Sequence, residues 1–315
     1  MDSASGRQSY EYAEITGYAL TFLVGRPSLT ESELAVGRRA ATWLAERTRR
    51  GTLAAREGWD NDAVYVFDLA MAASGLLSFG RRLRAEELVE AGLDLVNFLA
   101  VELGSAESIR AVSSRGHPAS RRSWSTHGQA HLAKLAQAVL LGGRPAAVDR
   151  LAGLIERVKE LQRGDGRMVT EAGVKTTMLH PHLYAAEGLW IWGSVTGDAD
   201  ALERARAAVE WAWTHQLEEG DFPRSVPERW REGARVEQCD VTAQAVRLAL
   251  VLGLRPDRVE RAIQRLTELA HGLPALVYQP AARDLHFNTC ATLFAAQALT
   301  MAATGAPVIS WNELV

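Results

Sequence analysis

The segment 179–190, with the sequence LHPHLYAAEGLW, carries His180, His182 and Tyr184 at the start of an otherwise apolar stretch. Pro181 suits the first turn of an α-helix, because the N–H that proline lacks has no helical partner there. Imidazole titrates near neutral pH and can move the proton that an epimerase or a lyase must transfer. We therefore predict two proton-transfer histidines at a helix N-terminus. The alternative is that one of them only hydrogen-bonds a neighbouring helix.

These two roles predict different behaviour on substitution. A proton-transfer His182 should tolerate replacement by alanine without loss of the fold, whereas a packing histidine should not. Glu187 lies further along the same segment. We expect it to orient Tyr184 or an adjacent helix, and so to stabilise the fold.

Carboxylates stand at comparable positions in three other segments. Glu14, Asp68 and Asp240 each lie near the start of a predicted apolar helix. Glycoside hydrolysis needs two carboxyl groups, one protonated and one ionised, on either side of the scissile bond. Asp240 in CDVTAQ also fits a helix N-cap. Three such residues from separate segments favour a shared catalytic site, to which we assign His180, His182, Glu14, Asp68 and Asp240.

Metal binding is the next possibility. His127 and His131 in HGQAH have the i, i+4 spacing of two ligands on one helical face, and Cys239 and Cys290 lie at later helix starts, with His286 near the second. No glutamate follows His127, and the cysteines lack a local ligand motif. We therefore predict no zinc at Cys239 and Cys290. No glycine-rich phosphate motif occurs either, and no cofactor is expected.

Two basic loops precede predicted helices, at 110–124 and 222–238. Arginine can hold a carboxylate or a phosphate through two parallel hydrogen bonds, which would suit an anionic substrate. A solvated loop balanced by its own glutamates explains the second loop equally well. Tryptophans near the same end could stack on sugar faces or fill the core. The predicted substrate-binding side chains are Tyr18, Trp59, Arg122, Trp124, His127, Tyr184, Arg224 and Asn288.

The elements that must position these residues are helices. Apolar residues recur at three- and four-residue intervals along the chain, and no run of alternating β-branched residues is found. The chain is predicted to be all-α. The expected helices are 9–24, 30–50, 62–79, 83–103, 124–142, 145–163, 180–196, 198–216, 240–253, 256–271 and 287–304.

Two kinds of helix alternate in this order. Every second one, such as 198–216, has a charged face, as a helix with one side in water should. The others are nearly uncharged and have their polar residues at the start, and these starts recur every 50–60 residues, which matches one helical hairpin per repeat. A helix that is apolar all round is buried all round.

Six buried helices alternating with surface helices predict an (α/α)6 barrel, an α/α toroid formed by residues 1–315 as one domain. Its inner helices would all point the same way, so their N-termini would meet at one mouth. A sixth outer helix is not evident, because the tail VISWNELV is too short. Either this tail closes the ring or the last hairpin is incomplete.

Composition limits the classes of function. The chain has 315 residues, 47% of them hydrophobic, and a formal charge of −3, as a soluble globular protein does. Nucleic-acid binding is not expected without a concentrated basic face. The apolar runs are too short to span a membrane, and the N-terminus lacks the pattern of a secretion signal. We predict a cytoplasmic protein with no membrane partner and leave its oligomeric state open.

Several segments that open the predicted inner helices carry a resemblance: YAEITGY, the FD of the third helix, LHPHLYAAEGL, DVTAQAVRL and HFNTCATLFAAQAL. Together with the alternation they resemble the six-hairpin glycosidase-like superfamily of (α/α)6 barrels, which is related to the terpenoid-cyclase and prenyltransferase toroids. Members that act on sugars place acidic residues or histidines at the inner mouth, so the resemblance implies that this mouth is the site.

The resemblance covers hydrolases, lyases, epimerases and cyclases, and it specifies the architecture more than the reaction. The expected function is acid–base chemistry on a carbohydrate or sugar derivative, including an anionic one. A terpenoid-cyclase-like enzyme is one alternative, and a non-catalytic sugar-binding or scaffold toroid is another.

Overall fold

The computed structural model describes residues 10–53, 63–103, 129–171, 173–228, 237–254, 256–280, 287–304 and 309–315. Helices dominate these residues, as predicted. The inner helices are α1 (Ala13–Val24), α3 (Val66–Leu83), the 3₁₀ helix η2 (Ala130–Leu135) with α5 (Ala136–Gly142), α7 (Leu179–Thr196), α9 (Cys239–Leu252) and α11 (Thr289–Thr304). The outer helices are α2 (Glu31–Arg50), α4 (Glu86–Glu102), α6 (Pro145–Glu160), α8 (Ala199–Trp213) and α10 (Pro256–Ala270).

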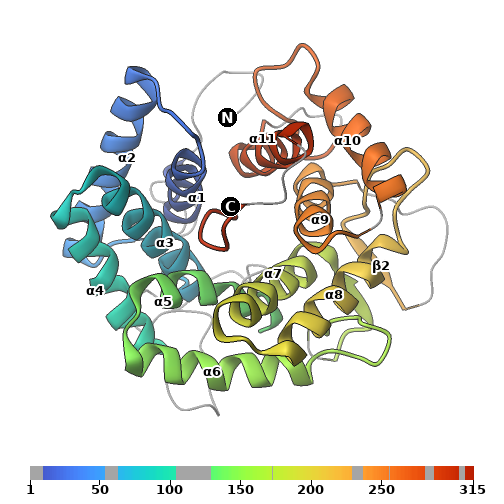
Figure 1. The fold of residues 1–315 in the computed structure, drawn as a ribbon, viewed down its shortest axis with the longest axis horizontal. Coiled ribbons are helices and arrows are strands. Elements are labelled where there is room, and N and C mark those ends of the chain that lie inside the picture. The colour runs from blue at the N-terminus through green and yellow to red at the C-terminus, as the bar shows by residue number, and fades with distance from the viewer. Residues whose placement is uncertain are drawn as a thin grey trace.

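The inner helices form a closed ring (Figure 1). Each contacts the next one along the chain, and α11 returns to contact α1. Each outer helix packs against the inner helix before it and also against the one that follows, so it fills the groove between them. The predicted toroid and its alternation of inner and outer helices are therefore confirmed.

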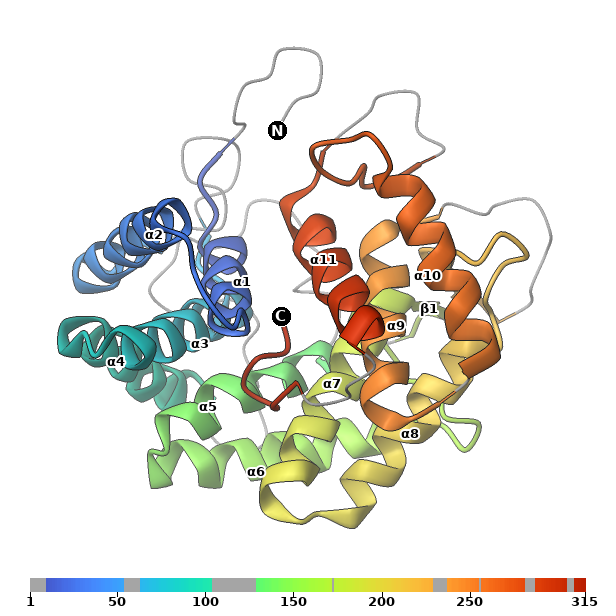
Figure 2. The ribbon, with the colours of Figure 1, turned by 45° about the horizontal axis from the view of Figure 1, so that its top comes forward.

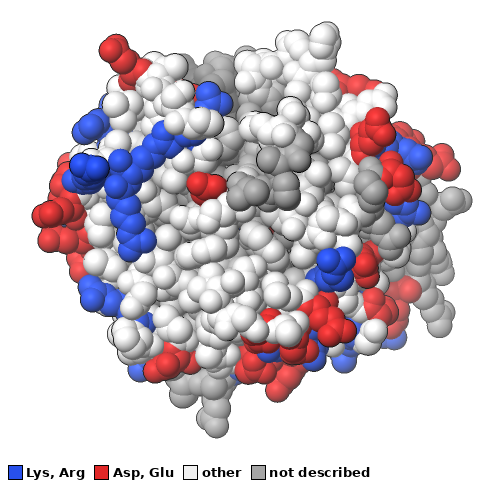
Figure 3. All heavy atoms as spheres, in the orientation of Figure 1, with Lys and Arg blue, Asp and Glu red and all other residues white. Residues whose placement is uncertain are grey.

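Burial follows the same division. In α3 every residue from 66 to 80 is buried, whereas α2 buries only one side. Small residues let the inner helices approach closely. A Cβ on Gly188 of α7 would lie 2.1 Å from the carbonyl carbon of Ala133, so only glycine permits this contact. Charged side chains gather around the edge of the face seen in Figure 3, while its centre is largely uncharged.

Short extended segments connect outer helices to inner ones. β1 (Thr176–Met178) pairs antiparallel with β2 (Ser225–Pro227), with Thr177 opposite Val226. The N–H of Leu179, the first residue of α7, donates to the carbonyl of Arg224 just before β2. This pairing fixes the start of α7 beside the segment that leads into α9.

The end of the chain resolves the question of the sixth outer helix. Residues 309–315 do not form an outer helix but lie inside the ring (Figures 1 and 2). Leu314 and Val315 are fully buried there. Among the described residues α11 consequently has no following outer helix, and the tail fills the interior instead.

The helix boundaries differ from prediction mainly in one place. The expected helix 124–142 is η2 followed by α5, and its first residues lie outside the described part of the chain. No helix in the described residues combines the length and the hydropathy needed to cross a bilayer.

Candidate functional site at the inner mouth

Side chains from four inner helices point into the ring at the same spacing. In α1, α7, α9 and α11 the inward residues recur at i, i+4 and i+7, the spacing that keeps side chains on one helical face. Several contacts between helices join equal positions of the triplets, such as His180 with Asp240 and Glu187 with Arg247, so the four helices run in parallel. Phe294 also reaches the adjacent layers, at His180 and Arg247. The inward triplets are Glu14, Tyr18 and Thr21; His180, Tyr184 and Glu187; Asp240, Gln244 and Arg247; and Cys290, Phe294 and Gln297.

The outermost layer contains an imidazole and a carboxyl group from neighbouring helices. Nδ1 of His180 lies 3.5 Å from Oδ2 of Asp240, and their side chains are 17% and 4% exposed. Asp240 is the second residue of α9, and the N-cap position belongs to Gln238. Its Oδ1 accepts a hydrogen bond from the N–H of Val241. The interpretation of Asp240 as an N-cap is therefore wrong.

Burial shifts both groups toward their neutral forms. It raises the pKa of Asp240 to about 7, although backbone N–H groups and the charge of Arg224 act in the opposite direction. It lowers the pKa of His180 to about 3, aided by the positive charge of Arg247 and by His131, while a contact with Gln244 opposes the shift. At neutral pH the pair thus combines a neutral imidazole with a carboxyl group near its midpoint.

An aromatic layer lies below this pair. The hydroxyl of Tyr18 donates to that of Tyr184 at 2.8 Å, and the two rings are nearly parallel. The ring of His180 lies 4.4 Å from Tyr184, and Phe294 meets Tyr18 edge to face at 5.4 Å. Phe67 of α3 adds a contact with Tyr184 at 4.9 Å. The site therefore has an aromatic floor with a pair of phenol groups.

Glu14 belongs to the same layer as the His180–Asp240 pair. Its side chain is buried, and its negative charge helps to raise the pKa of Tyr18, Tyr184 and Cys290, for which burial is the main cause. Asp240 acts on Cys290 in the same way. Cys290 thus lies within electrostatic reach of both carboxyl groups, and the two acids face one interior.

His182 is placed differently from the prediction. It is fully buried between α7 and α8, with Nδ1 accepting from the N–H of Met168 at 3.2 Å and Nε2 donating to the carbonyl of Ala208 at 2.8 Å. Burial lowers its pKa to about 4. Two residues along a helix turn by about 200°, so His182 faces the outer ring when His180 faces the inside. The proton-transfer role predicted for His182 does not fit this geometry.

The other predicted residues have four different placements. Arg224 is exposed, and its positive charge partly offsets the rise in pKa that burial causes at Asp240 and Tyr278. It therefore lies at the mouth. Asn288 uses its side-chain oxygen to accept from the N–H of Ala291, which makes it a cap of α11. Asp68 is fully buried in the first turn of α3. Trp59, Arg122, Trp124 and His127 lie outside the described residues.

Sequence reasoning named Glu187 but missed its two partners deeper in the ring. Lys134 and Arg247 are fully buried and form ion pairs of 3.1 Å and 2.9 Å with the two oxygens of Glu187, which is also fully buried. The sequence indicates these two residues, because Lys134 and Arg247 are isolated basic residues within mainly apolar segments. Tyr278 was also missed; the loop that carries it has no periodic pattern.

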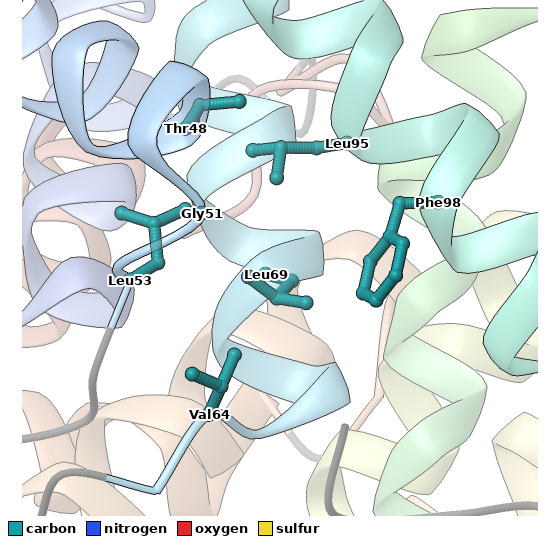
Figure 4. Close-up of a pocket in the computed structure, with 7 residues that line it drawn as sticks. All are labelled: Thr48, Gly51, Leu53, Val64, Leu69, Leu95 and Phe98. Carbon is teal, nitrogen blue, oxygen red and sulfur yellow. The ribbon is translucent and has the colours of Figure 1, made fainter. Parts of the chain in front are cut away.

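Two other features of the described residues do not add to the site. No three His, Cys, Asp or Glu side chains gather there in a way that could hold a metal ion. An apolar pocket lies between α2, α3 and α4 (Figure 4), but it carries no titratable group. Its lining residues are Thr48, Gly51, Leu53, Val64, Leu69, Leu95 and Phe98.

Comparison with known proteins yields structural matches only. No protein-family model and no curated protein sequence matches the chain. An unsaturated glucuronyl hydrolase from Bacillus sp. GL1, described as responsible for the degradation of glycosaminoglycan, superposes with a TM-score of 0.68 at 15% identity, covering 95% of this chain and 88% of its own. The cellobiose 2-epimerase of Bacillus thermoamylovorans gives 0.72 at 12% identity, with coverages of 96% and 91%.

A sugar epimerase from a ruminal bacterium gives a TM-score of 0.70 at 11% identity, covering 95% of this chain and 89% of its own. At such identities the likeness concerns the fold. The chain therefore has an α/α toroid fold, which it shares with glucuronyl hydrolases and sugar epimerases.

Proposed function

We propose that this chain is a carbohydrate-active enzyme that carries out an acid–base step, of hydrolase or epimerase type, on a sugar with a negatively charged substituent. The observation that carries the proposal is the pairing of His180 with Asp240 at the inner mouth. The structural neighbours, which are glucuronyl hydrolases and sugar epimerases, support a carbohydrate substrate, and the glucuronyl hydrolases support an acidic one.

Proton transfer is assigned to the pair. A carboxyl group with a pKa of about 7 is present in both forms at neutral pH, so Asp240 can donate a proton in one step and accept one in the next. His180 remains neutral and, with its more exposed ring, is the member of the pair that a substrate can reach. Glu14 supplies the second carboxyl group that a hydrolytic step would require.

Binding is assigned to the aromatic floor and to Arg224. Burial keeps Tyr18 and Tyr184 protonated, and Tyr18 donates its hydroxyl proton to Tyr184, so the buried floor beneath the mouth is uncharged and aromatic. The exposed guanidinium of Arg224 beside Asp240 suits a carboxylate on the sugar, because arginine binds carboxylates through two parallel bonds. This agrees with the uronyl substrates named for several neighbours.

The test compares Asp240→Asn with a matched variant elsewhere. Purified protein would be incubated with an unsaturated uronyl disaccharide and with cellobiose, and the products separated by chromatography. Asp221 is the control, because it is also a buried aspartate with a raised pKa. It pairs with Arg265 at 2.7 Å and belongs to none of the inward triplets. We expect turnover by wild type and Asp221→Asn, and a loss of about 10²-fold or more in Asp240→Asn.

Failure of wild type to act on any sugar would reject the enzyme proposal. Equal loss in both variants would reject the assignment of Asp240. The organisation of residues 1–315 as one domain, the cytoplasmic location and the absence of a cofactor stay predictions.

A further inference from the structure

Segment 309–315 is held inside the ring through its main chain. Nζ of Lys134 and Nε2 of Gln137 donate to the carbonyl of Leu314 at 3.0 Å and 2.9 Å. Gln297 donates to the carbonyl of Glu313 at 2.7 Å and accepts from the N–H of Val315 at 3.1 Å. Two inner elements, η2 with α5 and α11, thus hold one short segment.

Arg247 connects this segment to the rest of the interior. Its Nη1 donates to the carbonyl of Val315 and to Oε1 of Gln297, and its Nη2 donates to Oε1 of Glu187 at 2.9 Å. All these groups are buried. A guanidinium with partners on three sides has little freedom to move, because each of its bonds is directional.

The same guanidinium also supports the floor of the mouth. Its central carbon lies 4.0 Å from the centre of the Phe294 ring, a cation–π contact between two fully buried side chains. Phe294 in turn stacks on His180, with 6.2 Å between ring centres and 27° between planes. A continuous set of contacts therefore runs from segment 309–315 through Arg247 and Phe294 to His180.

We propose that Arg247 is a positioning residue for the His180–Asp240 pair: segment 309–315 fixes its guanidinium, and the guanidinium holds Phe294 against His180. This positioning role rests on the proposed acid–base function of the pair, whereas the contacts themselves do not depend on it. Segment 309–315 then has a defined role inside the ring, since it fixes the floor of the site through Arg247.

Titration of His180 provides a measurement that does not require activity. The charged and titratable groups that contact His180 or act on it are Arg247 and Asp240 from α9, His131 from η2 and Tyr184 from its own helix. Glu14 of α1 and Cys290 of α11 lie in the same layer. The charge of Arg247 helps to lower the pKa of His180 to about 3. Loss of that charge from a fixed position should raise the pKa toward its ordinary value.

The experiment uses full-length protein labelled at histidine, with His180 assigned by the signal missing in His180→Gln, and follows its NMR titration. In Arg247→Met we expect the pKa of His180 to rise from about 3, and in Arg247→Lys to stay low. Arg265→Met is the control, because Arg265 pairs with Asp221 outside the ring interior, and it should leave His180 unchanged. An unchanged titration in Arg247→Met, or an equal shift in the control, overturns the proposal.

Arg247→Met retains the Lys134–Glu187 ion pair, which has no net charge, and this favours folding. If Arg247→Met fails to fold, Gln297→Leu tests the proposal instead. It removes the hydrogen bonds of Gln297 to segment 309–315 and to Arg247, while the charges of Arg247 and Glu187 remain. We then expect a rise in the pKa of His180 in the same direction, and no rise overturns the proposal. With an active sugar substrate, Arg247→Met should lower kcat about 10-fold with little change in KM. An inactive wild type would reject the proposed function and leave the titration to decide this inference.

Discussion

His182 donates a 2.8 Å hydrogen bond from Nε2 to the backbone carbonyl of Ala208, and so ties inner helix α7 to outer helix α8. Nδ1 of the same ring accepts from the N–H of Met168. Replacement by alanine would leave the buried N–H of Met168 without this acceptor, would remove the link from α7 to the carbonyl of Ala208, and would open a cavity. We expect His182→Ala to lower the free energy of unfolding by about 3 kcal/mol or more.

Urea unfolding of His182→Ala beside His271→Ala measures this loss. His271 is exposed at the end of α10, and its replacement should cost less than about 0.5 kcal/mol. Equal stability of the two variants would restore the original prediction that His182 is dispensable for the fold.

The lowered pKa of His182 also predicts a pH dependence. Its folded-state pKa of about 4 lies below the ordinary value of 6.5, so protonation favours the unfolded chain. The contribution is fully present above pH 6.5 and is lost as the pH falls toward 4. His182→Gln can accept and donate the same two bonds without titrating. As the pH falls from 6.5 toward 4, wild type should therefore lose free energy of unfolding relative to His182→Gln. A constant difference between the two proteins would contradict the lowered pKa.

The raised pKa of Asp240 predicts that its contribution to stability changes with pH in the opposite direction to that of His182. Its pKa is raised to about 7, so it stabilises the fold most at low pH, and this contribution is lost as the pH rises through about 7. Under the proposed function its protonated form donates the proton, so kcat/KM should fall over the same range. Initial rates from pH 5 to 9 test this. Asp221→Asn should keep the wild-type profile, and an alkaline limb that persists in the residual activity of Asp240→Asn would point to another acid.

The architecture could be predicted because burial on all sides removes charge along an entire helix, and this shows in a single sequence. The direction in which individual side chains point can also be predicted from the sequence. His180, Tyr184 and Glu187 follow the i, i+4, i+7 spacing, and His182 falls outside it, so helical geometry alone separates the inward histidine from the outward one. The same spacing joins Asp240 to Arg247.

The course of segment 309–315 could not be predicted in this way. Its path inside the ring depends on main-chain carbonyls that meet Lys134, Gln137 and Arg247, and main-chain groups leave no trace in side-chain patterns. The role of Arg224 at the mouth depends likewise on the pairing of β1 with β2, two strands of three residues each that are too short to show alternation.

Glu187 accepts ion pairs from Lys134 at 3.1 Å and from Arg247 at 2.9 Å, and all three side chains are fully buried. Burial already lowers the pKa of Lys134 to about 8, against the favourable charge of Glu187. Glu187→Ala would leave two buried cations side by side without their carboxylate. We expect it to lower the free energy of unfolding by about 3–5 kcal/mol, as removal of one partner from a buried ion pair does.

The matched variant is Glu156→Ala. Glu156 also pairs with a lysine, Lys159, at 2.8 Å, but its side chain is 65% exposed, so its loss should cost less than about 1 kcal/mol. Urea unfolding of both variants at neutral pH gives the comparison. Similar stability of the two proteins would mean that water or structural relaxation compensates Lys134 and Arg247 when Glu187 is absent, and that Glu187 does not hold the interior together.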